Sequence, residues 1–156
     1  MFKKIILLSL AALSSGVYAD TSDEINEWYI AQNGQYLIRD SINDGYYANL
    51  SSNQRGDLNV YLQFWDEAKC KTDGDKVMGH DPLYVNDKLV KYSQACNGSW
   101  RTFFPSTEAG RKYIVSQFKK KNLVEITTYK KDFKVLFSAK GFTKLFNEKR
   151  MQLDAI

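Results

Sequence analysis

The sequence contains few of the residues that break or link a chain, with two prolines in 156 residues. It has no internal repeat and no low-complexity run, whereas linkers between domains are usually rich in proline, glycine or polar repeats. Its length suits one domain with its own hydrophobic core. We therefore expect a single globular domain over residues 20–156, with residues 1–19 set apart from it.

The shortage of histidine and cysteine excludes most metal and redox chemistry. A zinc site needs more ligands than His80 and two distant cysteines can supply, and a catalytic cysteine pair usually has the close Cys-x-x-Cys spacing. Cys70 and Cys96 are an even pair, which in an oxidising compartment indicates one structural disulfide. We expect this bond to stabilise the fold by roughly 3–4 kcal/mol, and we expect no metal and no cofactor.

Long apolar runs are also scarce, and the clearest one, Ile5–Leu13, lies near the N-terminus. Two lysines precede it, and a stretch of mostly small and weakly polar residues that ends at Ala19 follows it, which is the order of a secretory signal peptide. The run is shorter than the roughly 20 residues that a membrane-spanning helix needs. We therefore predict a cleavable signal peptide over residues 1–19, of a short bacterial type, and a periplasmic location.

What is present is a series of short periodic runs separated by turn residues, the pattern of an antiparallel β domain. Leu58–Trp65 alternates apolar and polar residues most clearly. Asn33-Gly34 and Asn86-Asp87 are candidate hairpin turns, while Lys71–Lys76 and Gly79–Pro82 are predicted to be a charged loop and a turn. The predicted fold class is mainly β, an antiparallel sandwich or partly open barrel with two helices in the C-terminal region. An α+β two-layer domain is the alternative.

Both predicted helices follow the main group of strands. The first comes after Ser106, a candidate N-cap, and ends in Lys119–Lys121, where the helix dipole favours cations. The second runs from about Phe142 to Met151 after Gly141, whose conformational freedom suits a joint between a strand and a helix. We expect the lysines around this joint to be solvated, so the joint is predicted to be structural rather than an anion-binding loop.

Residues for catalysis are hard to assemble from this sequence. His80 is the single imidazole, and no serine stands in a nucleophile-elbow context. Asp73-Gly74-Asp75 lacks the further ligands of a calcium loop, and Asp66 and Glu67 are adjacent, so they point apart on a strand. We therefore predict that the protein is not an enzyme. A hydrolase built on His80 is the alternative, and it needs a triad assembled from distant residues.

Charge is unevenly distributed along the chain. Residues 20–104 carry 8 basic and 13 acidic side chains, whereas residues 105–156 carry 12 and 5. This asymmetry either marks a face for weak contact with an anionic surface or reflects the solvated surfaces of the helices and of the hairpin between them. No nucleic-acid partner is expected for an exported protein. Lipid headgroups, cell-wall polymer or an acidic protein are the anionic partners that remain.

Aromatic residues are abundant, with 3 Trp, 10 Tyr and 9 Phe. Most are expected to pack on half-buried strands, but Tyr and Trp are also enriched at binding surfaces. Tyr46 and Tyr47 cannot both point inward on one strand, so at least one is a candidate for exposure. Trp100 is expected to pack around the disulfide. The candidate binding face combines aromatic anchors with two lysine groups: Tyr46, Tyr47, Trp65, Lys119, Lys120, Lys121, Lys130 and Lys131.

The C-terminal part of the chain carries a family resemblance. The segment FSAKGFTKLF, residues 137–146, resembles the end of the invasion-associated locus B family of exported bacterial proteins. The preceding IVSQFKKKNLVEITTY is similar too, as a helix, a lysine-rich turn and a strand, so the likeness spans residues 114–146. Trp28 is not followed by the cysteines that the family pattern would place there. The resemblance implies a small, largely β, periplasmic and non-catalytic domain, and it carries over no binding residue.

Together these features predict a non-enzymatic periplasmic binding module that acts through a protein partner, of the inhibitor, immunity or envelope-adaptor type. A rigid face with a few aromatic anchors would dock on the partner with help from charge complementarity. The first alternative is a small-molecule or lipid carrier that holds its ligand in a barrel mouth. A purely architectural role, with the basic C-terminal part on a membrane surface, is a further alternative. No oligomeric state is predicted.

Overall fold

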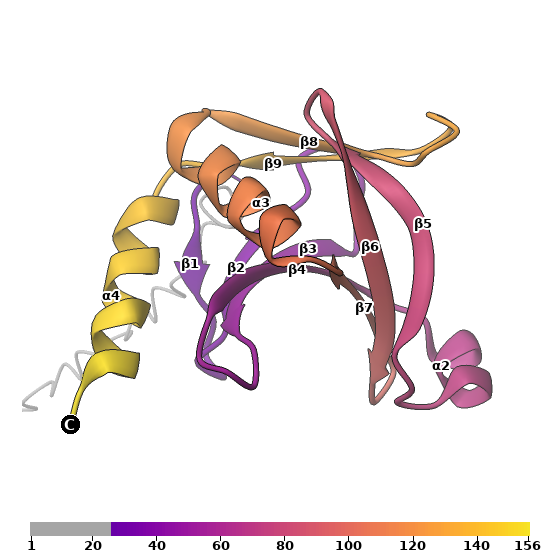
Figure 1. Cartoon of the computed structure of the whole chain (residues 1–156), viewed down its shortest axis with the longest axis horizontal. Helices are drawn as coiled ribbons and strands as arrows, with labels where there is room; N and C mark the ends of the chain where they lie inside the picture. The colour runs from indigo at the N-terminus through magenta and orange to yellow at the C-terminus, as the bar shows by residue number, and fades with distance from the viewer. Residues whose placement is uncertain (1–25) are drawn as a thin grey trace, which may run out of the picture.

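The structure is a computed structural model that describes residues 26–156, so the predicted signal peptide lies outside the described residues. Strands dominate this part of the chain, and three helices interrupt them (Figure 1). In chain order the elements are β1 (Tyr29–Ile30), β2 (Tyr36–Arg39), β3 (Tyr46–Ser52), β4 (Leu58–Trp65), α2 (Glu67–Asp73), β5 (Met78–Val85), β6 (Lys88–Asn97), β7 (Trp100–Pro105), α3 (Glu108–Lys120), β8 (Leu123–Thr127), β9 (Lys134–Ser138) and α4 (Phe142–Asp154).

The nine described strands form one antiparallel sheet in the order β1-β2-β3-β4-β7-β6-β5-β8-β9. The sheet curls around α3 as a half-barrel, with β8 and β9 on the other side of α3 from β3 and β4 (Figure 1). Its inner face, against which α3 packs, is apolar: Leu58, Val60 and Leu62 of β4 are all buried. The opposite side of the sheet is its outer face. The prediction of a mainly β fold is confirmed, in the form of a partly open barrel.

The two ends of the sheet approach each other along a seam between β2 and β9. The Ser41 N–H donates to the Leu136 carbonyl at 2.8 Å, and the Asp40 carboxylate accepts the Leu136 N–H at 2.7 Å. Asp40, which is 5 % exposed, also accepts the N–H groups of Ile42 and Asn43. These bonds supply partners to backbone groups that the edge of a sheet would otherwise leave unpaired.

An aromatic cluster anchors α3 and α4 at one end of the half-barrel. The indole of Trp28 lies edge-on to Phe118 of α3, with 5.3 Å between ring centroids, and to Phe142 of α4, with 5.0 Å. The indole Nε1–H donates to the Ser138 carbonyl at 3.0 Å. All three rings are at most 4 % exposed. Because buried aromatic pairs combine a large apolar area with a preferred geometry, this cluster fixes both helices against the sheet.

The predicted disulfide is present: Cys70 of α2 is bonded to Cys96 of β6. Cys96 is registered opposite Arg101 of β7, so these two residues share one face of the sheet, and Trp100, the neighbour of Arg101, points to the other face. The prediction that Trp100 packs around the disulfide is therefore wrong. Its indole contacts other aromatic rings on the outer face instead.

The segment predicted to be a charged loop, Lys71–Lys76, begins inside a helix. α2 spans Glu67–Asp73, and the Asp66 carboxylate caps it by accepting the Lys69 N–H at 3.1 Å. Two ion pairs between side chains four residues apart lie along this short helix. The loop prediction is wrong for Lys71–Asp73, because it considered the charges and the glycine without the capping aspartate that precedes them, and it is confirmed for Gly74–Lys76.

The segment predicted to be a turn, Gly79–Pro82, lies within β5. His80 is registered opposite Tyr92 of β6, and the register then shifts between His80 and Leu83 as a bulge. The turn prediction is wrong because a bulge lets the strand continue past Pro82, which lacks an N–H for the ladder. Because His80 is registered opposite the buried Tyr92, the two residues share the inner face of the sheet, where the candidate site lies.

The two C-terminal helices are confirmed, with one change at a cap. Thr107 caps α3 by accepting the Gly110 N–H at 3.0 Å, so the prediction of Ser106 is wrong by one residue. At the joint before α4, Gly141 has a φ of 80°, and a Cβ there would lie 3.0 Å from the side chain of Glu27. Glycine is therefore favoured by the left-handed conformation, and a larger residue would also have to displace the side chain of Glu27. Within residues 26–156, none of the helices is long and apolar enough to cross a membrane.

Both predicted hairpins are confirmed, although the first has a wider turn than the two residues Asn33-Gly34, since its last strand pair is Ile30 with Tyr36. Asn33-Gly34 lies between the antiparallel strands β1 and β2, and Asn86-Asp87 lies between β5 and β6. Gly34 and Asn86 have φ angles of 80° and 52°, the left-handed conformation that tight hairpins need.

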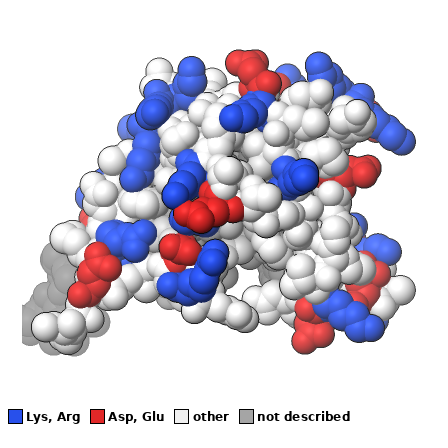
Figure 2. Space-filling model, in the orientation of Figure 1, with Lys and Arg blue, Asp and Glu red and all other residues white. Residues whose placement is uncertain are grey.

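Charged side chains are unevenly distributed over the surface. Figure 2 shows Lys and Arg along the edge formed by β8 and β9 and around α3 and α4, with acidic and basic groups mixed near α2.

Candidate ligand-binding pocket

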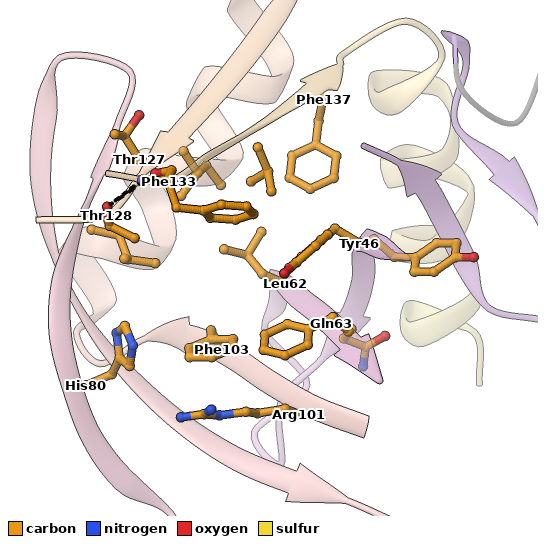
Figure 3. A pocket seen from close by; sticks show the side chains of 15 residues that line it. Tyr46, Leu62, Gln63, His80, Arg101, Phe103, Thr127, Thr128, Phe133 and Phe137 are labelled. Atoms are coloured by element: carbon orange, nitrogen blue, oxygen red, sulfur yellow. Dashed lines mark hydrogen bonds between the residues drawn. The ribbon is translucent and has the colours of Figure 1, made fainter. Parts of the chain in front are cut away.

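A pocket of about 260 Å³ opens on the inner face of the half-barrel, and we call it the inner pocket. Its walls come from β3, β4 and β7 on one side and from β8 and β9 on the other, with β5 between them (Figure 3). Most of its lining side chains are apolar or aromatic, and a few polar groups converge on it. A concave, mostly apolar pocket with a small number of placed polar groups is the usual form of a small-molecule site.

Aromatic rings form much of the wall of the inner pocket. The ring of Tyr46 lies 5.0 Å from that of Phe64 and 5.2 Å from that of Phe133. Phe64 stacks on Phe103 with 5.7 Å between centroids and 16° between planes. In Figure 3 the labelled rings of Tyr46, Phe103 and Phe133 surround one space. A ligand that covers these rings would remove apolar surface from water, which is favourable.

The turn between β8 and β9 holds Phe133 at the edge of the inner pocket. The Thr128 hydroxyl accepts the N–H of Phe133 at 3.2 Å and donates to the Asp132 carboxylate at 2.5 Å. That hydrogen bond from Thr128 lowers the pKa of Asp132. The Thr128 N–H also donates to the Phe133 carbonyl at 3.0 Å. The turn is therefore well bonded, and it presents a ring that is 40 % exposed.

One cation lies at the polar end of the inner pocket. The Arg101 guanidinium donates to Gln94 Oε1 from Nε, at 3.0 Å, and from Nη2, and its Nη1 lies 3.4 Å from the Asp66 carboxylate. These contacts use three of the five N–H donors of a guanidinium, and the side chain remains 20 % exposed. The guanidinium carbon is 5.3 Å from the centroid of Phe103. Arg101 is thus oriented by the protein and keeps donors for an anion.

His80 faces the same pocket from β5. Its Nδ1 lies 2.7 Å from the Asp81 carbonyl oxygen, so Nδ1 carries a proton and donates it to this oxygen. Its ring meets Phe103 edge-on at 4.8 Å. The partner of Nδ1 is a backbone carbonyl, whereas a Ser-His-Asp triad needs a carboxylate there. Within the described part of the chain, no group of three or more His, Cys, Asp or Glu side chains could hold a metal ion.

The aromatic residues of the predicted binding face lie on opposite sides of the sheet. Tyr46 lines the inner pocket with Phe64 and Phe133. By strand register Tyr47 and Trp65 point to the outer face, although Tyr47 also borders the inner pocket. Trp65 is 58 % exposed and meets Trp100 edge-on at 5.6 Å. The structure therefore divides these residues between two surfaces.

The two predicted lysine groups lie at opposite ends of β8. Lys119–Lys121 closes α3 before β8 begins, and Lys130 and Lys131 follow its end. The Nζ of Lys119 lies 3.6 Å from the centroid of the Phe146 ring, and burial, together with the charge of Arg150, lowers the pKa of Lys119. Lys130 and Lys131 lie in the turn that borders the inner pocket.

Arg101, Phe64 and Phe103 are site residues that sequence reasoning missed. Arg101 and Phe103 alternate on β7, and Phe64 extends the alternating apolar series of β4, so the pattern contains a signal that all three share a face. Their meeting depends on the pairing of β4 with β7, which places Phe64 opposite Arg101. That pairing joins strands separated by α2, β5 and β6, so no local pattern indicates it.

Comparisons with known proteins identify no relative of this chain. No family model, no curated protein and no solved structure matches the chain. The fold and the site therefore define its class by themselves: a disulfide-linked, curled antiparallel half-barrel with an apolar pocket on its inner face. The resemblance to the invasion-associated locus B family stays a prediction.

Proposed function

We propose that the protein is an exported, non-enzymatic binding protein that holds a small amphipathic anion in the inner pocket. The observation that carries this proposal is the place of Arg101 at one end of a pocket whose other walls are mainly aromatic and aliphatic. The disulfide between Cys70 and Cys96 and the predicted signal peptide support a periplasmic location, since disulfides persist in oxidising compartments.

The chemistry of the pocket sets the class of ligand. The apolar part would lie between the rings of Tyr46, Phe103 and Phe133, and its carboxylate or similar group would take charge-assisted hydrogen bonds from Arg101. His80 Nε2, which makes no hydrogen bond within residues 26–156, offers a further polar contact at this end. The volume of about 260 Å³ is just below the roughly 300–1,000 Å³ of most ligand pockets, so the ligand is expected to be small.

Binding fits the polar groups of the pocket better than catalysis does. A general base must be oriented by a second group and must reach the proton that it removes. His80 is oriented only by a backbone carbonyl, and the hydroxyl of Thr128 is engaged in the β8–β9 turn. The lining residues thus supply donors and apolar walls without a paired acid and base. The non-catalytic character implied by the C-terminal resemblance agrees with this proposal.

An anionic aromatic dye tests the proposal. We would titrate 1-anilinonaphthalene-8-sulfonate, which fluoresces on apolar surfaces, into the wild type and into Arg101→Met, Arg101→Lys, Phe133→Ala and Trp65→Ala. We expect Arg101→Met and Phe133→Ala each to weaken binding by at least about tenfold. Arg101→Lys should keep most of the affinity, and Trp65→Ala, on the outer face, should leave it unchanged.

The outcomes separate the two parts of the proposal. Near-ultraviolet circular dichroism establishes that each variant is folded, because loosely packed states also bind this dye. Equal affinity of the wild type and Arg101→Met would show that Arg101 does not bind the anionic group of the ligand. If Phe133→Ala also bound the dye with full affinity, the inner pocket would not be the binding site.

A protein partner is a second candidate, and the chemistry of the β8–β9 turn favours it. Tyr129 is 54 % and Phe133 40 % exposed, with Lys130 and Lys131 between them. Exposed aromatic anchors next to charges that steer association are typical of docking surfaces. A double Lys130→Glu, Lys131→Glu variant should recover less partner from envelope extracts than the charge-matched Lys120→Glu, Lys121→Glu variant. Equal recovery of the partner by both variants at low salt would show that the β8–β9 turn is not the docking surface.

A further inference from the structure

We propose a second binding site, on the outer face of the sheet, that takes an uncharged oligosaccharide. Tyr47 and Gln63 border both hollows, but Trp100, Asn97 and Gln35 line only the outer one, so either site can exist without the other. The observation that motivates it is a hollow of about 330 Å³, which we call the outer hollow. Amide and aromatic side chains dominate its lining, and no charged side chain belongs to it.

Strand register places the outer-face residues in neighbouring rows. Tyr47, Gln63 and Thr102 lie directly opposite one another across β3, β4 and β7. The next row contains Trp65, Trp100 and Asn97 across β4, β7 and β6. Residues opposite each other in an antiparallel pair share one face of the sheet, so the two rows together form a continuous surface.

The aromatic part of this surface is built from contacting rings. Trp100 is 36 % exposed, and its indole meets Tyr47 edge-on with 5.8 Å between centroids. The same indole meets Trp65 edge-on at 5.6 Å. Because each ring is braced by a neighbour, Trp100 offers a fixed apolar platform beside the outer hollow.

The amide part of the surface is ordered and only partly satisfied. Asn49 Nδ2 donates to Gln63 Oε1 at 3.2 Å, and Asn33 Nδ2 donates to Gln35 Oε1 at 3.1 Å. These bonds fix the amide groups and leave the Nε2 donors of Gln35 without a partner in the described part of the chain. The side-chain amide of Asn97 likewise makes no hydrogen bond there, so both of its functions, donor and acceptor, are available to a ligand.

Sugars combine the two properties that this surface requires. A pyranose ring presents C–H groups on its faces and hydroxyls around its rim. The C–H face suits an exposed indole such as that of Trp100, and each hydroxyl, being both donor and acceptor, suits a side-chain amide. An anionic polymer would need cations that the outer hollow lacks. Protein interfaces are enriched in Met and Arg as well as in aromatic residues, and neither Met nor Arg lines the hollow.

The test uses the purified, disulfide-bonded chain and neutral oligosaccharides. Chitohexaose, cellohexaose and maltohexaose would each be titrated up to about 10 mM while tryptophan emission and calorimetric heats are followed. We expect at least one of the three to bind. Trp100→Ala should weaken that binding by at least about tenfold, whereas Tyr129→Ala, which removes an exposed ring on the β8–β9 turn, should not change it.

Isosteric variants test the amides without disturbing the fold. Asn97→Asp and Gln35→Glu keep the shape of the side chain but replace the donor by a charged acceptor, so each should weaken the same binding by at least about fivefold. Binding of none of the three oligosaccharides overturns the proposal, and so does equal binding by wild type and Trp100→Ala. Stronger binding of hyaluronan than of every neutral chain would also overturn it. Trp100→Ala should bind the dye as the wild type does. This result would show that the inner pocket is intact, whatever the outcome for the oligosaccharides.

Discussion

Tyr46 and Tyr47 are neighbours on β3 and serve opposite faces of the same sheet. The ring of Tyr46 lies 5.2 Å from Phe133 in the inner pocket, and the ring of Tyr47 lies 5.8 Å from Trp100 beside the outer hollow. This follows from the alternation of side chains along a strand. One strand therefore contributes an aromatic wall to both candidate sites, and the two sites can be separated by single substitutions.

A reciprocal pair of variants exploits this arrangement. Tyr46→Leu should weaken binding of the anionic dye by about tenfold and leave any oligosaccharide response unchanged, because it removes a ring only from the inner pocket. Trp100→Leu, which removes a ring that lines the outer hollow and not the inner pocket, should do the opposite. Dye fluorescence and tryptophan emission measure the two effects. A variant that changes both by the same factor would show that the faces are not independent.

Asp40 is expected to be a main contributor to the seam. Asp40→Ala leaves the N–H groups of Leu136, Ile42 and Asn43 without the carboxylate that accepts them. Buried donors without a partner are costly, so we expect the free energy of unfolding to fall by about 3 kcal/mol in urea titrations. Amide exchange at Leu136 should become faster. Asp44→Ala, at an exposed position, is the control and should change stability by less than about 0.5 kcal/mol.

Tyr92 is a candidate for stabilisation by substitution. Its side chain is 2 % exposed, its hydroxyl has no hydrogen-bond partner within the described residues, and burial raises its pKa. Tyr92→Phe should therefore raise the free energy of unfolding by up to about 1 kcal/mol. Tyr36→Phe should lower it by about 1 kcal/mol, because the Tyr36 hydroxyl donates to Gln152 at 3.2 Å. Equal losses in both variants would mean that Tyr92 does have a partner.

The disulfide should contribute a large share of the stability. A Cys70→Ala, Cys96→Ala variant is expected to lose roughly 3–4 kcal/mol of unfolding free energy, mainly because the unfolded chain is no longer constrained. Reductant should destabilise the wild type by a similar amount and should not affect the double variant. A loss below about 1 kcal/mol in urea would contradict the expectation that the bond stabilises the fold by constraining the unfolded chain.

Glu125 should make stability depend on acid pH. Its carboxylate bonds the Lys134 ammonium at 2.9 Å, and this hydrogen bond lowers the pKa of Glu125 below its ordinary value of 4.5. A depressed pKa in the folded state adds stability that is present above pH 4.5 and is lost as the pH falls through the folded value. Lys134→Met should raise the pKa of Glu125, as measured by NMR titration of the carboxyl group. The same variant should lose less stability as the pH falls. Lys144→Met is the control, and an unchanged Glu125 pKa in Lys134→Met would contradict the assignment.

Local patterns in the sequence were sufficient for many elements of the fold. The alternation in Leu58–Trp65 predicts β4, Asn33-Gly34 predicts the first hairpin, and Gly141 predicts the joint before α4, because each depends on neighbouring residues alone. α2 was missed because its decisive residue, Asp66, acts through a cap rather than through apolar periodicity. The strand character around His80 was missed because the bulge depends on pairing with β6.

The candidate site was harder to predict than the fold. Tyr46 was identified, but its partners Phe64, Phe103 and Arg101 were not, because the inner pocket exists only where β4 and β7 pair and where the β8–β9 turn reaches back over them. These contacts join residues far apart in sequence, and non-local pairing leaves little trace in composition or spacing. Counting aromatic residues and charges therefore indicated binding surfaces without indicating which residues share one.

The seam between β2 and β9 also bears on how the protein resists aggregation. An open sheet has two edges, and each edge is a template on which a strand of another molecule can pair. In this half-barrel, Ser41 and Asp40 occupy part of the β9 edge from within the same chain. Opening the seam would therefore expose this part of the β9 edge as a template for a strand of another molecule, the first step of domain swapping or fibril growth.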